Sequence, residues 1–182
     1  VYAILGATKF ILDGKDELFL NQLEYYRRGV EGIDDRSVDT WLVNAKGESV
    51  GRNRGNNENY FPDYYVLPVA ENLQKNPLEV YNIVEYLLRN GVKVDKTTEA
   101  VVVNGKEYPE GTYVVNMRQA KRGYANAVLS EGFDVSDFDE MYAEIVMNFP
   151  ALRGFDVDII RTPNVFDGKT QKVESVSVPP TV

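Results

Sequence analysis

The stretch "DYYVLPVAENLQKNPLEVYNIVEYLLRNGVKVDKTT", residues 63–98, predicts a strand, a helix and a second strand. The run "DYYVLPV" is continuously apolar, which is typical of a strand buried on both faces. In "KNPLEVYNIVEYLLRNG", Asn76 is a good helix cap, Pro77 suits the first helical position and Gly91 follows the last apolar residue. A crossover helix between two strands makes a βαβ unit, so this stretch predicts parallel strands.

The segments on either side extend this unit. Residues 16–28 have a helical apolar pattern that we expect to end at Gly29, and Gly14 interrupts this helix or separates two helices. Asn104-Gly105 predicts the turn of a hairpin in "EAVVVNGKEYPEGTYVVNM", whose closing strand is "TYVVNM". We also expect a brief strand at 40–44, helices at 122–130 and 136–149, and two β-like pieces around residues 167–168.

Together these elements predict an α/β fold. We expect a small mixed, mainly parallel sheet flanked by helices and preceded by a helical segment. Residues 1–59 would form that helical segment and a linker, because "GRNRGNNEN" (51–59) is polar and loop-like. Residues 60–182 would form the α/β domain.

Composition restricts the chemistry. The chain of 182 residues has a net charge of -8, which argues against a nucleic-acid binder because such a protein needs an electropositive surface. It contains no Cys and no His. A Ser-His-Asp triad, a Cys nucleophile and the usual zinc ligands are therefore impossible within this chain. We expect no catalytic residue, no bound metal and no cofactor in it.

Two further features concern the limits of the chain. No apolar run approaches the roughly 18–20 residues that a membrane-spanning helix needs, so we expect no membrane span. The sequence begins at Val1 without a signal-peptide pattern, which suggests a piece of a longer or processed protein.

Three basic residues follow the predicted strand 112–117. Arg118, Lys121 and Arg122 lie where that strand leads into a helix, a place where side-chain donors and free N–H groups can hold a phosphate or carboxylate. The glycine pattern of a phosphate-binding loop is missing. The alternative is a solvated loop in which one Arg pairs with a nearby acid.

Other clusters favour structural interpretations. The acids Asp134, Asp137, Asp139 and Glu140 lack the glycine of a calcium-binding loop and suit a helix N-terminus. The aromatic-rich "ENYFPDYYVLPV" (58–69) could stack on a sugar or peptide, but such residues more often frame a strand entering a core. A hydrolase built on two carboxylates is a further alternative, since 28 acidic residues bring some pairs together by chance.

Several phrases resemble a known family. "LNQLEYYRRGVEGIDD", "NNENYFPDYYVLPV", "KNPLEVYNIVEYLLRNGVKV", "VNGKEYPEGTYVVNMRQAKRGYANAVL" and "MNFPALRGFDV" are similar to the C-terminal part of large bacterial zinc carboxypeptidase family proteins. The resemblance covers roughly Leu20 to Val157. In that family a catalytic peptidase domain precedes a domain similar to class I glutamine amidotransferases, which have a flavodoxin-like sheet.

The resemblance implies a function without implying a catalytic residue. The family's zinc ligands would lie before Val1, and the amidotransferase Cys and His are absent from this chain. We therefore expect a non-catalytic accessory domain that supports the peptidase domain or recruits its peptide substrate. Its partners would be that upstream domain, peptide substrate, or a second copy through the N-terminal helical segment. A secreted or cell-surface location is implied by the family alone. The alternative is a non-catalytic module that binds a small ligand or anion through Arg118, Lys121 and Arg122.

Overall fold

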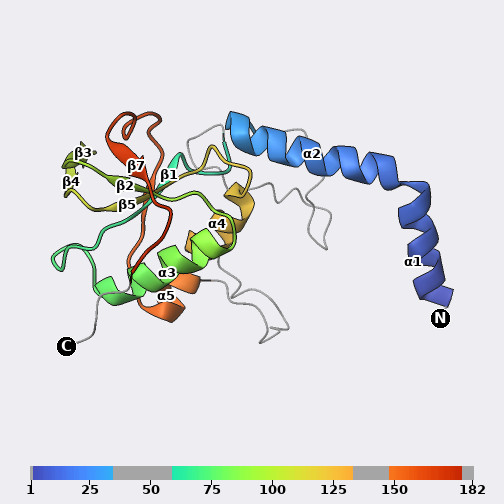
Figure 1. Cartoon of the computed structure of the whole chain (residues 1–182), viewed down its shortest axis with the longest axis horizontal. Coiled ribbons are helices and arrows are strands. Elements are labelled where there is room, and N and C mark those ends of the chain that lie inside the picture. Colours follow the sequence, from blue (N-terminus) through green and yellow to red (C-terminus); the bar gives the residue numbers. More distant parts are fainter. Residues whose placement is uncertain (1, 35–58, 133–147, 178–182) are drawn as a thin grey trace, which may run out of the picture.

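The computed structural model of the chain describes residues 2–34, 59–132 and 148–177 (Figure 1). Its helices are α1 (Tyr2–Asp13), α2 (Lys15–Glu31), α3 (Pro77–Arg89), α4 (Arg122–Leu129) and α5 (Phe149–Arg153). Its strands are β1 (Tyr64–Leu67), β2 (Asp95–Thr97), β3 (Val101–Val103), β4 (Lys106–Tyr108), β5 (Tyr113–Asn116), β6 (Asp158–Ile160) and β7 (Thr170–Lys172). Residues 59–132 and 148–177 form what we call the body, and α1 with α2 form the arm.

The main sheet has five strands in the order β6-β1-β5-β2-β7, and every neighbouring pair is antiparallel. The predicted mainly parallel, flavodoxin-like sheet is therefore wrong. Helix α3 does connect β1 to β2, and these two strands run in the same direction. They are not neighbours, because β5 lies between them and is antiparallel to both.

Two signals led to that error, the crossover helix between β1 and β2 and the continuous apolar run of β1. All four of its residues are buried, with Tyr64 and Val66 on one face of the sheet and Tyr65 and Leu67 on the other. Such a run is typical of parallel sheets because helices usually cover both of their faces. Here one face is covered by helices and the other by a hairpin, so an antiparallel strand is buried on both sides.

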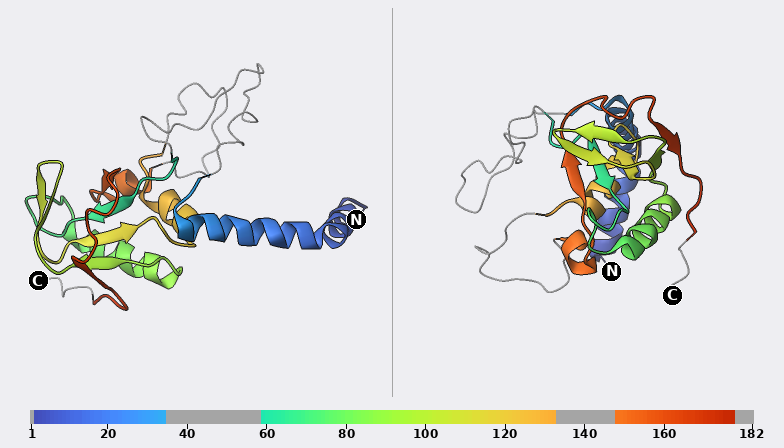
Figure 2. Two further views of the ribbon diagram at one scale, coloured as in Figure 1. Left: turned by 90° about the horizontal axis from the view of Figure 1, so that it is seen from above. Right: turned by 90° about the vertical axis from the view of Figure 1, so that its left-hand side faces the viewer.

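The two faces carry separate cores. On one side, α3 and α4 pack against β1 and β5 through a cluster that includes Val84, Leu87, Val115 and Leu129 (Figures 1 and 2). On the other side, the β3–β4 hairpin packs against the sheet through Val101, Val103 and Tyr108, and Phe166 from the segment between β6 and β7 joins this cluster.

The hairpin turn at Asn104-Gly105 is confirmed. Both residues have positive φ, 51° and 81°, as a tight two-residue turn between twisted strands requires. The closing strand was assigned wrongly, since β3 pairs with β4. The run "TYVVNM" instead contains β5, the central strand of the main sheet.

The helix signals were mostly reliable. Asn76 caps α3 by accepting a hydrogen bond from the Glu79 N–H at 3.2 Å. Gly14 separates α1 from α2. Helix α2, however, runs through Gly29 to Glu31, and Gly32 with a φ of 69° ends it.

Some predicted elements lie outside the described residues, namely the strand at 40–44 and most of the helix at 136–149. The two β-like pieces of the tail correspond to β6 and β7. They lie at opposite edges of the main sheet and do not pair with each other.

The arm projects away from the body (Figures 1 and 2). Only Gly29 of its two helices is buried. In the described part of the chain, no helix is both long and apolar enough to cross a membrane.

Candidate functional site

The three basic residues singled out from the sequence lie where the arm meets the body. The loop after β5 is held in place by Gln119, which is 3% exposed. Its side-chain amide accepts a hydrogen bond from the Lys93 N–H at 2.8 Å and donates to the Lys93 carbonyl at 3.1 Å. It also donates to the Asn116 carbonyl at 2.7 Å. The loop is thereby fixed to the segment that precedes β2.

Arg122, the first residue of α4, is 5% exposed. One of its guanidinium nitrogens donates to the carbonyl oxygen of Ile33, just beyond α2, at 2.6 Å. The guanidinium carbon lies 4.5 Å from the centre of the Phe61 ring, which is cation–π geometry. Arg122 therefore ties the end of the arm to the body.

Lys121 and Arg118 also face the arm. The Lys121 ammonium lies 5.9 Å from the centre of the Tyr26 ring on α2. The exposed Arg118 side chain lies over Gly32, where an added Cβ would come within 2.8 Å of it. All three predicted basic residues thus contact the last turns of α2 or the residues directly after it.

Glycines allow the two parts to approach this closely. A Cβ on Gly29 would lie 2.6 Å from the backbone oxygen of Gln119, and a Cβ on Gly123 would lie 1.8 Å from the Tyr25 hydroxyl. Real Cβ atoms do not approach other atoms so closely. Gly29 and Gly123 therefore let α2 pack directly on the loop and on the start of α4. We call this contact between the end of α2 and residues 117–123 the joint.

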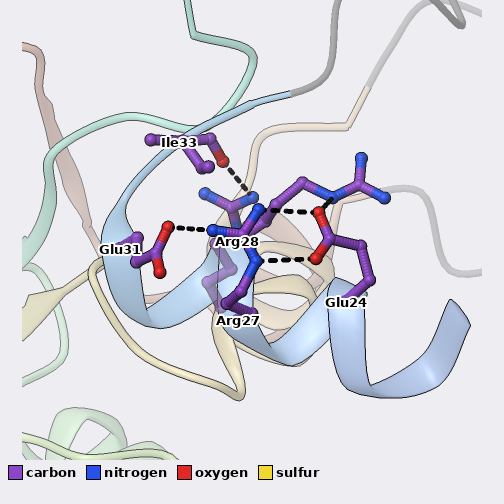
Figure 3. Close-up of polar contacts among 6 residues, drawn as sticks. Glu24, Arg27, Arg28, Glu31 and Ile33 are labelled. Atoms are coloured by element: carbon purple, nitrogen blue, oxygen red, sulfur yellow. Dashed lines mark hydrogen bonds and ion pairs between the residues drawn. The ribbon is translucent and has the colours of Figure 1, made fainter. Parts of the chain in front are cut away.

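A network of charged side chains lies along the last turns of α2 next to the joint (Figure 3). Arg27 pairs with Glu24 at 2.6 Å and also with Glu31, while Arg28 pairs with Glu24 at 3.2 Å. Figure 3 also shows the Ile33 carbonyl pointing toward the bound guanidinium. Exposed pairs within one helix add only about 0.3–0.5 kcal/mol each, so they support the last turns of α2 rather than define a binding site.

A hollow of about 30 Å³ lies beside the joint and is lined by Phe61, Asp63, Arg118 and Arg122, among others. This volume suits ordered water better than a phosphate. Burial raises the pKa of Asp63, and the nearby Arg118 and Arg161 offset part of that rise. Asp63, which directly precedes β1, therefore interacts electrostatically with Arg118 of the basic loop.

The other candidate residues from the sequence either lie in the core or fall outside the described residues. Tyr64 and Tyr65, from the aromatic-rich stretch, are 4% and 2% exposed and belong to the two cores, as the structural interpretation predicts. The acids at 134, 137, 139 and 140 lie outside the described residues. Within the described ranges, no group of three or more His, Cys, Asp or Glu residues is arranged to hold a metal ion.

Sequence reasoning missed the partners of the basic loop. Phe61 and Ile33 carry no signal of a role, because one is an apolar residue and the other contributes only its carbonyl. Gly29 did carry a signal, but we interpreted it as the end of a helix.

Comparison with known proteins gives no relative. No protein-family model, curated protein or solved structure matches this chain.

Proposed function

We propose that this chain is a non-catalytic accessory region of a zinc carboxypeptidase-like protein. In this proposal the arm packs against the peptidase domain, and the body supports that domain or recruits its peptide substrate. Zinc and the catalytic residues would belong to the peptidase domain. The identity of that domain rests on the sequence resemblance.

The observation that carries the proposal is the exposed apolar surface of the arm. Its large apolar side chains are 40–91% exposed: Tyr2, Ile4, Leu5, Phe10, Ile11, Leu12, Leu18, Phe19, Leu20, Leu23, Tyr25 and Val30. Each leaves on the order of 100 Å² in water, so together they expose on the order of 1,000 Å². The largest apolar patch on a typical monomer is roughly 300–600 Å². A surface of this size supports a role in packing against another domain.

The pattern on α1 also favours burial against a large partner. The ion pair between Lys9 and Asp13, at 2.8 Å, marks a charged line along this helix. Apolar residues such as Ile4, Leu5 and Phe10 occupy the other sides. A helix that is apolar around most of its circumference usually lies within a core or a deep groove.

The joint supports the same proposal. Basic residues that could bind an anion instead hold the arm on the body, through Arg122 and Ile33 above all. A fixed joint would let the arm position the body relative to the peptidase domain.

The test is peptidase kinetics of the whole protein, with and without residues 60–182, on a dipeptide-like substrate and a long peptide. If only the long substrate is processed more slowly after the deletion, the body recruits peptide. If both decline, it supports the peptidase domain. If both rates are unchanged, the proposal fails.

An anion-binding module is the second candidate, and the observation that favours it is the exposed side chain of Arg118, which lies close to Arg122. A bound phosphate or carboxylate should then raise the melting temperature of the chain, and Arg118→Ala should abolish the increase. Absence of any shift across a panel of anions would count against this function.

A further inference from the structure

A second, larger concavity lies on the body, away from the joint. It has a volume of about 530 Å³ and is bordered by α3, β2, β5, β7 and the segment that follows β7 as far as Ser177. This volume is within the usual range for sites that bind small molecules. We call it the tyrosine groove, after Tyr81 and Tyr113 in its wall.

The apolar wall of the groove is already packed. The rings of Tyr81 and Tyr113 meet edge to face with centres 6.0 Å apart. Val173 is 9% exposed and belongs to the core, and Val176 packs against that core. A ligand would therefore meet a preformed surface and would not have to order it.

The groove is lined by two ammonium groups, one of them on Lys96, and by hydroxyl groups that can donate hydrogen bonds. The Lys96 ammonium lies 5.6 Å from the centre of the Tyr113 ring and makes no ion pair with any residue that the structure describes. Tyr113 is 4% exposed, and its accessible part lines the groove. Burial, together with nearby Tyr81, raises the pKa of Tyr113, so its hydroxyl keeps its proton at neutral pH.

The one acid in the lining already has a partner. Glu174 pairs with Lys172 at 2.7 Å. Lys96 therefore leaves an uncompensated positive charge next to an aromatic wall, in a chain whose net charge is -8. A carboxylate is the ligand group that matches a charged donor beside a hydroxyl donor.

We propose that the tyrosine groove binds a carboxylate attached to an apolar group. Lys96 and the Tyr113 hydroxyl take the carboxylate, and Tyr81 with Val176 contacts the apolar group. The C-terminus of a peptide and a free aryl-substituted acid share this chemistry. The peptide source rests on the proposed function in peptide recruitment, whereas the groove itself does not.

The first experiment is calorimetric titration of the 182-residue chain with three probes. These are N-acetyl-Ala-Phe with a free carboxylate, the same dipeptide as its C-terminal amide, and 3-phenylpropionate. A charged hydrogen bond contributes about 1.5–3 kcal/mol, so the free dipeptide should bind at least about tenfold more tightly than the amide. Equal affinities for acid and amide, or no saturable binding of either acid, would overturn the proposal.

The probes also separate the two sources. Binding of both acids supports a peptide C-terminus as ligand. Binding of 3-phenylpropionate alone supports the carboxylate site and excludes the peptide source. Because these titrations need no peptidase domain, their failure is distinct from the failure of the proposed function, which only the peptidase kinetics measure.

Matched variants test whether Lys96 and Tyr113 bind the carboxylate. Lys96→Met should weaken binding of the acids about tenfold and leave the amide unaffected, and Tyr113→Phe should weaken it several-fold. Lys93→Met makes the same charge change at an exposed position outside the groove and should have no effect. Unfolding curves of each variant show whether it is folded. Full acid binding by a folded Lys96→Met variant would refute the site.

Discussion

The body and the arm place the same kinds of side chain in opposite environments. In the body, Val66, Leu67 and Leu87 are each 0% exposed, whereas Ile4, Phe10 and Leu20 of the arm are 63–71% exposed. The arm consists of two helices, the body contains both helices and strands, and both regions are similarly rich in apolar residues. The difference lies in packing. The apolar side chains of the body pack against one another, whereas most of those on the arm pack against no other described residue. Since helices derive most of their stability from packing, the body should be the stable unit of the isolated chain.

The largest difference should appear when one leucine is truncated in each region. Leu87→Ala removes a side chain enclosed by the helix-side core and should lower the free energy of unfolding by about 2–5 kcal/mol. Leu20→Ala in the arm should change it by less than about 0.5 kcal/mol. Denaturant titration of both variants measures the contrast. Similar losses from the two would mean that the arm is packed in the isolated chain.

The joint can be broken through Gly29. Gly29→Ala places a Cβ against the Gln119 backbone, so we expect a loss of about 1–3 kcal/mol and faster proteolysis between arm and body. Gly6→Ala is the matched control, because nothing lies within 4 Å of a Cβ there. It should instead stabilise α1 by up to about 1 kcal/mol. Equal behaviour of the two variants would contradict the direct packing of α2 on the loop.

Arg122 should contribute more to the free energy of unfolding than an exposed arginine does, because it holds the joint. Arg122→Met loses the hydrogen bond to Ile33 and the contact with Phe61, and we expect a loss of about 1–2 kcal/mol. Arg89→Met, at the exposed end of α3, should cost only a few tenths of a kcal/mol. Urea unfolding compares them. If Arg122→Met leaves the free energy of unfolding unchanged, Arg122 does not hold the joint, and the anion-binding alternative is favoured.

The smallest effect concerns the tyrosines of the body. Burial raises the pKa of Tyr65, and burial together with Asp158 raises that of Tyr108. A raised pKa means that the folded state favours the protonated phenol. Stability should therefore be fully present below the ordinary tyrosine pKa of about 10 and decline as pH rises above it. Tyrosinate absorbance should show these residues ionising late, or only on unfolding. Ionisation of every tyrosine near the ordinary value in folded protein would contradict their burial.

Local signals in the sequence predicted most single elements. Asn76 as a cap, Gly14 as a break and Asn104-Gly105 as a turn all act through their own backbone and nearest neighbours. Strand pairing depends on residues far apart in the chain. The apolar run of β1 showed burial on both faces but could not show that a hairpin covers one of them.

The same distinction holds for the candidate site. The sequence identified Arg118, Lys121 and Arg122 as a group, and the structure does bring them to one place. The sequence could not reveal that α2 lies against them. A glycine such as Gly29 is typical both of a helix end and of a point where two backbones pack closely, and the sequence does not distinguish the two. The tyrosine groove was missed because Tyr81, Lys96 and Tyr113 lie on three separate elements.

The most direct test of the central claim is hydrogen exchange of α1 and α2 in the isolated chain and in the whole protein. The proposed function predicts rapid exchange of α1 in the isolated chain and strong protection in the whole protein, because there the proposed peptidase domain would cover the arm. Protection that appears when the isolated chain is merely concentrated would mean that a second copy covers the arm. Equally rapid exchange of α1 in both forms would contradict the account, since its apolar surface would then have no partner.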